Sequence, residues 1–274
     1  MKGMFRRNPV PRSAGALALA AAAVMAVFGN ATVASAQIGH VKMTLPKSIS
    51  PSPVFLVPGI CGNDVPNGTA TCNATIIKAI DFARKTEPLY AIPPSFSLAA
   101  FDKLTGPEQI FAIANIERTA RGLPPILATT VQLDAMAESG ATQQGDPSVK
   151  LPLRLTHGGL ATAYGSNFAE GTANAMGADY YWMYDDGLNS PNTECTTHNT
   201  KACWGHRENV LFNYANTAYC PRGSKPTMYM GTAEVTSHVK WSPSITEIFV
   251  NDCGAMPSDR NFTWPDVQKL VFGH

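Results

Sequence analysis

The sequence predicts an α+β fold, because helical patterns come first along the chain and strand-like patterns follow them. Three segments between residues 107 and 184 place apolar residues at helical spacing. Two later runs read as strands: 228–235 alternates apolar and small residues, and 245–250 is rich in β-branched and aromatic residues. This order of elements indicates helices and a sheet packed as layers around one core.

The start of the chain has the features of an export signal. A basic stretch is followed by an apolar run over 16–28 and then by the small residues Ala34, Ser35 and Ala36, which are typical of a cleavage site. The apolar run is shorter than the roughly 20 residues that a membrane span needs. We therefore expect residues 1–36 to be a signal peptide, and the mature chain to be secreted and to have no transmembrane segment.

The next segment, 37–100, is expected to be a Pro-rich N-terminal extension. Residues 37–72 combine several prolines with many Ser, Thr and Gly residues, which favours irregular structure over a packed core. Residues 74–85 place apolar side chains at helical spacing and end before Pro88, so the extension should contain one helix.

The main domain is expected over 101–253, with 254–274 as a C-terminal tail. Pro107 suits the first turn of its first helix. The N–H groups of a first turn have no acceptor within the helix, so the N–H that proline lacks is not missed there. Thr130 can cap the second helix. The third helix is predicted over 173–184, where Met and Tyr residues recur at helical spacing and indicate core packing.

Charge excludes one class of partner. The formal net charge is +1 at pH 7, and 15% of the residues are charged. Nucleic-acid binding relies on a basic field, and this composition provides none. We therefore expect no nucleic-acid partner.

The cysteines fit an exported protein, since six is an even number and disulfides persist outside the cell. Spacing alone leaves fifteen possible connectivities, and we predict that neighbours in sequence pair. The predicted disulfides are Cys61–Cys72, Cys195–Cys203 and Cys220–Cys253.

An alternative exists for one of these pairs. Cys195, His198, Cys203 and His206 lie within a dozen residues and could form a small structural zinc site. The disulfide is the favoured interpretation, because thiolates are hard to keep reduced outside the cell. In that case 187–203 is a loop insertion that overhangs a cleft.

His206 is the leading candidate for a functional residue. It follows the helix breaker Gly205, and Val210 and Leu211 lie at positions that would face the core of a short helix. A histidine at a helix start lies beside unsatisfied N–H groups and can be directed into a cleft. His157 is a second candidate, with acidic residues between the two in sequence.

Several motifs in one order resemble the CAP superfamily, also called SCP or PR-1-like, in its bacterial form. The run from Gly205 to Leu211 is similar to the family's Gly-His-Arg-x-Asn-Ile-Leu signature. The other matching segments are 115–125, 156–157, 164–171 and 182–186. The resemblance implies a three-layer α/β/α sandwich with a central antiparallel sheet and a cleft over it. Members of the family include sterol- and lipid-binding proteins.

The resemblance also implies which residues line the cleft. In that family two histidines and two acidic residues do so, and the site can bind a divalent metal. Carried over to this chain, the histidines are His157 and His206, and the second acidic position is filled by an aspartate, Asp186 or Asp185. Ser166 stands where the family has its first glutamate, and Glu170, four residues later, could replace it only if the loop is rearranged.

These observations leave three functional hypotheses. The first is a secreted CAP-like protein whose histidine-lined cleft binds a small amphipathic ligand such as a lipid or sterol, a cell-envelope component, or a divalent metal such as zinc. The alternative is a metal-dependent hydrolase of cell-wall or peptide substrates, although no catalytic residue can be assigned. The third is an adhesive surface protein whose contacts are made by 37–100.

Overall fold

The computed structural model describes residue 61, residues 70–85 and 87, and residues 91–273. The predicted signal peptide and residues 37–60 lie outside the described residues. The helices are α1 (Ala70–Arg84), α2 (Leu98–Phe101), α3 (Gly106–Ala120), α4 (Val131–Gln143), α5 (Ala175–Tyr184), α6 (Gly205–Leu211) and α7 (Trp264–Val267). The strands are β1 (Ala128–Thr130), β2 (Leu153–Arg154), β3 (Leu160–Ala161), β4 (Tyr164–Glu170), β5 (Thr227–Val235), β6 (Ser244–Asp252) and β7 (Arg260–Thr263).

The main sheet has five strands in the order β4-β6-β5-β1-β7, so the predicted α+β class is confirmed. The sheet is mixed, however, and the expectation of a wholly antiparallel sheet was wrong at one position. β1 runs parallel to β5, whereas the β4–β6, β5–β6 and β1–β7 pairs are antiparallel. A parallel pair needs a long crossover connection, and the chain between β1 and β5 provides one that includes α4, α5 and α6.

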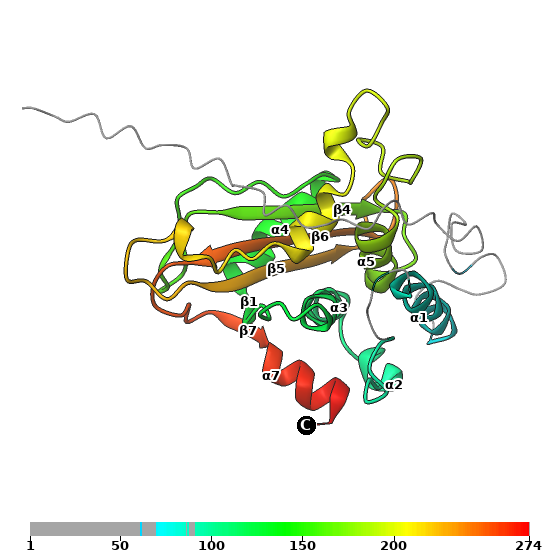
Figure 1. The fold of residues 1–274 in the computed structure, drawn as a ribbon, viewed down its shortest axis with the longest axis horizontal. Helices are drawn as coiled ribbons and strands as arrows, with labels where there is room; N and C mark the ends of the chain where they lie inside the picture. The colour runs from blue at the N-terminus through cyan, green and yellow to red at the C-terminus, as the bar shows by residue number, and fades with distance from the viewer. Residues whose placement is uncertain (1–60, 62–69, 86, 88–90, 274) are drawn as a thin grey trace, which may run out of the picture. The chain divides into compact units, whose positions relative to one another are not determined.

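Successive residues of β5 belong to different clusters of buried side chains, because neighbouring residues of a strand point to opposite sides of the sheet. On β5, Met228 and Met230 join the cluster of buried residues that contains the core side of α3. The intervening Tyr229 joins a second cluster with Leu133 and Ala137 of α4. Figure 1 shows α4 partly behind the strands and α3 below β5 in this view.

Side-chain caps fix where the central helices begin. Thr105 and Glu108 form a capping box at the start of α3, with Pro107 in its first turn. Thr130 Oγ1 accepts a hydrogen bond from the Leu133 amide at the start of α4. The predictions for Pro107 and Thr130 are therefore confirmed. Asn174 caps α5 in the same way.

The sequence reading missed β4, the edge strand next to β6. Its residues include Gly165, Ser166 and Asn167, types that are depleted in strands. The structure gives a tertiary reason for the glycine: a Cβ at Gly165 would collide with the Tyr214 hydroxyl and the Asn209 side chain. β4 is thus a strand because of its tertiary contacts: it pairs with β6, and Tyr214 and Asn209 pack against Gly165.

Both ends of the described chain pack on the same core as the main domain. Ile76 and Ile80 of α1 are fully buried in the cluster that also contains α5 residues, and Val267 and Val271 at the C-terminal end belong to it too. β7, within the predicted tail, pairs with β1 at the edge of the sheet. The extension and the tail therefore contribute to the core.

All three predicted disulfides are present. Cα–Cα distances are 5.1 Å for Cys61–Cys72, 4.5 Å for Cys195–Cys203 and 5.2 Å for Cys220–Cys253. Among the described residues, no helix has both the length and the apolar character needed to cross a membrane.

Candidate functional site

His206 lies at the start of α6, as predicted, and is held there by Asp186. The His206 Nδ1 and Asp186 Oδ1 atoms are 2.7 Å apart. The other carboxylate oxygen, Oδ2, accepts the backbone N–H of His206 at 3.0 Å and that of Arg207 at 3.4 Å. Asp186 therefore fixes the imidazole and satisfies the first N–H groups of α6, where a negative charge is favourable.

This pairing changes the protonation of the imidazole. Burial alone would lower the pKa of His206, but the hydrogen bond to Asp186 and the charge of that carboxylate outweigh this effect and raise the pKa. The carboxylates of Asp146 and Glu194 act in the same direction. His206 is therefore held more firmly in its charged form than a free histidine would be, with its side chain still 21% exposed.

A cavity of about 420 Å³ adjoins His206. It is bounded by the end of β4, the end of α5 and part of the loop between α5 and α6. Its aromatic lining residues are Phe168, Tyr181 and Trp182. Its acidic lining residues are Asp146, Glu170, Asp185, Asp186 and Glu194. The combination is an acidic pocket with apolar walls, a chemistry suited to a small ligand that has both polar and apolar parts.

The loop that covers part of this cavity is closed by the Cys195–Cys203 disulfide, and Asn192, Thr193 and Glu194 border the cavity. The loop thus borders the cavity, and its interpretation as an insertion stays a prediction. The alternative zinc site lacks its thiolates, since both cysteines are oxidised, and His198 is exposed.

Asp185 is a carboxylate of this site whose oxygens have no hydrogen-bond partner. It follows the last residue of α5 and is 2% exposed, and both of its carboxylate oxygens are buried without a hydrogen-bond partner. Burial, and then the charge of Asp186, raise the pKa of Asp185 to about 7. A buried carboxyl group in this state is costly, because it has lost water and gained no partner.

Three of the five cleft residues predicted from sequence come together at this cavity: His206, Asp186 and Glu170. Glu170 lies at its exposed edge, where Oε2 accepts a hydrogen bond from Gln144 at 2.9 Å. Glu170 reaches the cavity from the end of the regular strand β4, and its replacement of the family's first glutamate stays a prediction.

The other two predicted residues do not line this cavity. His157 lies in the turn between β2 and β3 with a positive φ of 50°, is exposed, and has its Nδ1 atom 2.7 Å from Ser258 Oγ. Ser166 is paired with Ile248 in the sheet, and its carbonyl accepts a hydrogen bond from Asn209. The metal role predicted for His157 together with His206 therefore stays a prediction.

Sequence reasoning missed Asp146, Glu194 and Tyr181 as lining residues and left Asp185 as an alternative to Asp186. A partial signal existed for Glu194, which precedes Cys195 in the loop predicted to overhang the cleft. Asp146 gave no signal, because it comes from the segment after α4 and reaches the site only through the fold.

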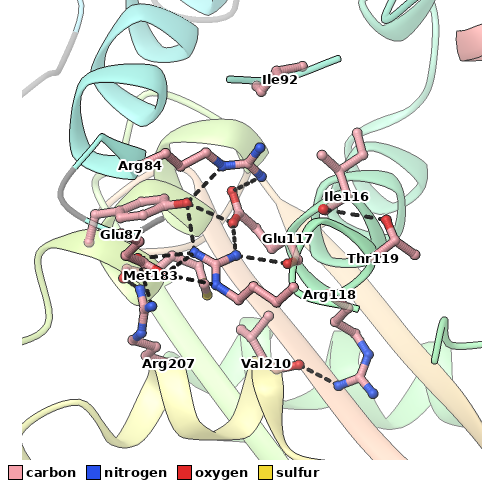
Figure 2. Close-up of polar contacts among 12 residues, drawn as sticks. Arg84, Glu87, Ile92, Ile116, Glu117, Arg118, Thr119, Met183, Arg207 and Val210 are labelled. Atoms are coloured by element: carbon pink, nitrogen blue, oxygen red, sulfur yellow. Dashed lines mark hydrogen bonds and ion pairs between the residues drawn. The ribbon is translucent and has the colours of Figure 1, made fainter. Parts of the chain in front are cut away.

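A buried ionic network anchors the elements behind the cavity (Figure 2). Glu117 of α3 forms an ion pair with Arg84 of α1 at 2.9 Å and another with Arg121, and it accepts a hydrogen bond from the Tyr184 hydroxyl at 2.7 Å. Burial would raise the pKa of Glu117, but Arg84 and then Arg121 outweigh that effect and lower it to about 2.

The same network reaches the helix that carries His206. Arg207, the residue after it, pairs with Glu87 at 2.8 Å and donates a hydrogen bond to the Met183 carbonyl. Arg121 pairs with Glu87 as well, at 3.1 Å. α6 is thus attached to α5 and to the segment after α1, so the position of His206 depends on the N-terminal extension.

We compared the chain with family models, curated proteins and solved structures, and none of the three comparisons found a match. The site is therefore interpreted from its own geometry.

Proposed function

We propose that this chain is a secreted, CAP-like binding protein whose cavity beside His206 and Asp186 holds a small amphipathic ligand. The observation that carries the proposal is the cavity itself, about 420 Å³ with aromatic residues on its walls and a fixed His–Asp pair at its border. Lipids, sterols and cell-envelope components remain the classes from which such a ligand would come.

The packing of helices supports the CAP-like part of the proposal. Helix α4 contacts one set of alternating β5 residues and α3 the other, as a three-layer α/β/α sandwich would require. The motif around His206 also occupies a helix start, as the breaker Gly205 predicted. The mixed sheet is a departure from the antiparallel sheet of the expected architecture.

Three disulfides support secretion, because they persist in oxidising surroundings. The predicted signal peptide, 1–36, is the sequence feature that supports it independently.

A zinc ion fits the described residues poorly. Zinc sites use three or four protein ligands, and no group of three His, Cys, Asp or Glu side chains converges in the part of the chain that the structure describes. His206 has its Nδ1 engaged by Asp186, and His157 lies elsewhere. For this reason we favour ligand binding over the metal-dependent hydrolase.

The proposal can be tested by blocking the cavity. Ligand-observed NMR would measure binding of 4-phenylbutan-1-ol, a neutral amphiphile, to the secreted protein. Thr193→Trp places a bulky side chain at the cavity border and should abolish the signal. Thr196→Trp is the matched control, since Thr196 lies on the same loop, is exposed and does not line the cavity.

Equal signals from both variants would contradict the proposal, and so would the absence of binding to the unaltered protein by both this neutral amphiphile and 4-phenylbutylamine. A calorimetric titration with zinc chloride on His157→Ala and His206→Ala tests the metal prediction separately. If the unaltered protein binds zinc and either variant does not, the result would support the predicted metal site shared by His157 and His206.

A further inference from the structure

The carboxylates around the cavity differ in how well they are compensated. Asp186 accepts hydrogen bonds from the His206 and Arg207 amides and from Asn192, and it pairs with the imidazole. Glu170 has Gln144 as a partner. Asp185 is almost wholly buried and has no partner at either oxygen. Asp146 and Glu194 are exposed to solvent, so Asp185 is the buried carboxylate of this cavity that the described residues leave without a partner.

The position of Asp185 indicates that the missing partner of its carboxylate is positively charged. It directly follows α5, a ten-residue helix, and the C-terminal end of a helix carries unsatisfied carbonyls and a partial negative charge. Asp186 adds a second carboxylate next to it. The one imidazole on the cavity wall, His206, is already engaged by Asp186. Asp185 itself has no protein partner, whereas His206 already offsets part of the charge of Asp186 and Arg207 donates a hydrogen bond to the Met183 carbonyl at the end of α5.

The walls beside Asp185 suit an organic cation better than a bare ion. Trp182 is fixed by a hydrogen bond of 3.1 Å from its indole Nε1–H to the Phe168 carbonyl, and Tyr181 completes an aromatic border. Aromatic faces attract ammonium and guanidinium groups and also pack against alkyl chains. A metal ion would need several converging ligands, and the described residues offer no such group of three.

We infer that the ligand of this cavity is an amphipathic organic cation, an alkyl ammonium or guanidinium, whose charged group pairs with Asp185 and whose apolar part lies against Phe168, Tyr181 and Trp182. The inference rests on the proposed function, since it identifies the chemical class of the ligand in the same cavity. It gives a specificity-determining role to Asp185, which the resemblance offered only as an alternative to Asp186.

The test compares two probes that differ in charge. Isothermal calorimetry would measure the affinity of the secreted protein for 4-phenylbutylamine and for 4-phenylbutan-1-ol. A charged hydrogen bond in a buried site should make the amine bind about tenfold more tightly or better. Asp185→Asn keeps the shape and removes the charge, so it should reduce that preference to less than about threefold. Glu138→Gln, an exposed carboxylate of α4 outside the cavity, is the matched control and should retain it.

The outcomes separate the inference from the function on which it rests. If both probes bind the unaltered protein equally, the organic-cation inference is overturned and the binding function stands. If the amine preference survives Asp185→Asn, Asp185 is not its partner and the inference also fails. If neither probe binds, the binding function fails too. The probe comparison on the unaltered protein does not depend on any variant folding, and thermal unfolding would check that Asp185→Asn is intact.

Discussion

Two adjacent residues, Tyr184 and Asp185, show opposite ways of burying charge. Tyr184 belongs to a network in which Glu117 has two arginine partners, and its own hydroxyl joins them. Asp185, one residue later, is equally buried and has no partner. The first arrangement compensates its charges within the protein and links three helices. The second leaves a charge uncompensated at a cavity, which is what a binding site needs and a purely structural site avoids.

The largest expected effect comes from removing a charge from the buried ionic network around Glu117. Glu117→Gln leaves Arg84 and Arg121 buried near each other without their shared carboxylate, and this should lower the free energy of unfolding by about 3–5 kcal/mol. Urea unfolding at pH 7 measures it. Because the pKa of Glu117 is lowered to about 2, its contribution is present above pH 4 to 5 and is lost as the pH falls toward 2. If the free energy of unfolding falls by less than about 1 kcal/mol, the network contributes little to the stability of the fold.

The opposite sign is expected at Asp185. Asp185→Asn removes a buried carboxylate that has no partner, so it should stabilise the protein by about 1–3 kcal/mol at pH 8. Since the pKa of Asp185 is raised to about 7, the cost of ionising it grows as the pH rises from about 4 to 7. The gain should therefore vanish at pH 4. Thermal unfolding at the two pH values measures the difference, and destabilisation at pH 8 would contradict the comparison.

A smaller effect should appear in ligand affinity. Only the ionised form of Asp185 attracts a cation, so binding of 4-phenylbutylamine should weaken by about tenfold between pH 8 and pH 6. The groups that interact with Asp185 are Asp186, Tyr180 and Tyr181, and burial raises the pKa of both tyrosines so that they stay neutral. Protonation of His206 acts in the same direction. Calorimetry on Asp185→Asn isolates the His206 part, and an unchanged pH profile there would argue against Asp185.

Local sequence chemistry predicted much of the secondary structure. Pro107 and Thr130 marked the starts of α3 and α4, and the runs 228–235 and 245–250 became β5 and β6. β4 was not predicted, because its glycine, serine and asparagine carry no strand signal and its pairing with β6 determines its conformation.

The candidate site was predictable only in part. His206, Asp186 and Glu170 could be identified because each stands in or near a recognisable motif. His157 stands in such a motif too, yet the β2–β3 turn places it beside Ser258 rather than at the cavity. Short strands and turns set such positions, and their geometry depends on distant contacts that no local pattern encodes.

The sequence by itself determined where α3 and α4 begin and the two long strands, because caps and periodicity are local properties, whereas it left fifteen possible pairings of the cysteines. Only the tertiary structure decided that Glu117 meets Arg84, that β1 runs parallel to β5 and that Asp185 is left without a partner. The reason is physical: compensation of a buried charge depends on which groups lie within a few ångströms in space, and those groups come from segments far apart in the chain.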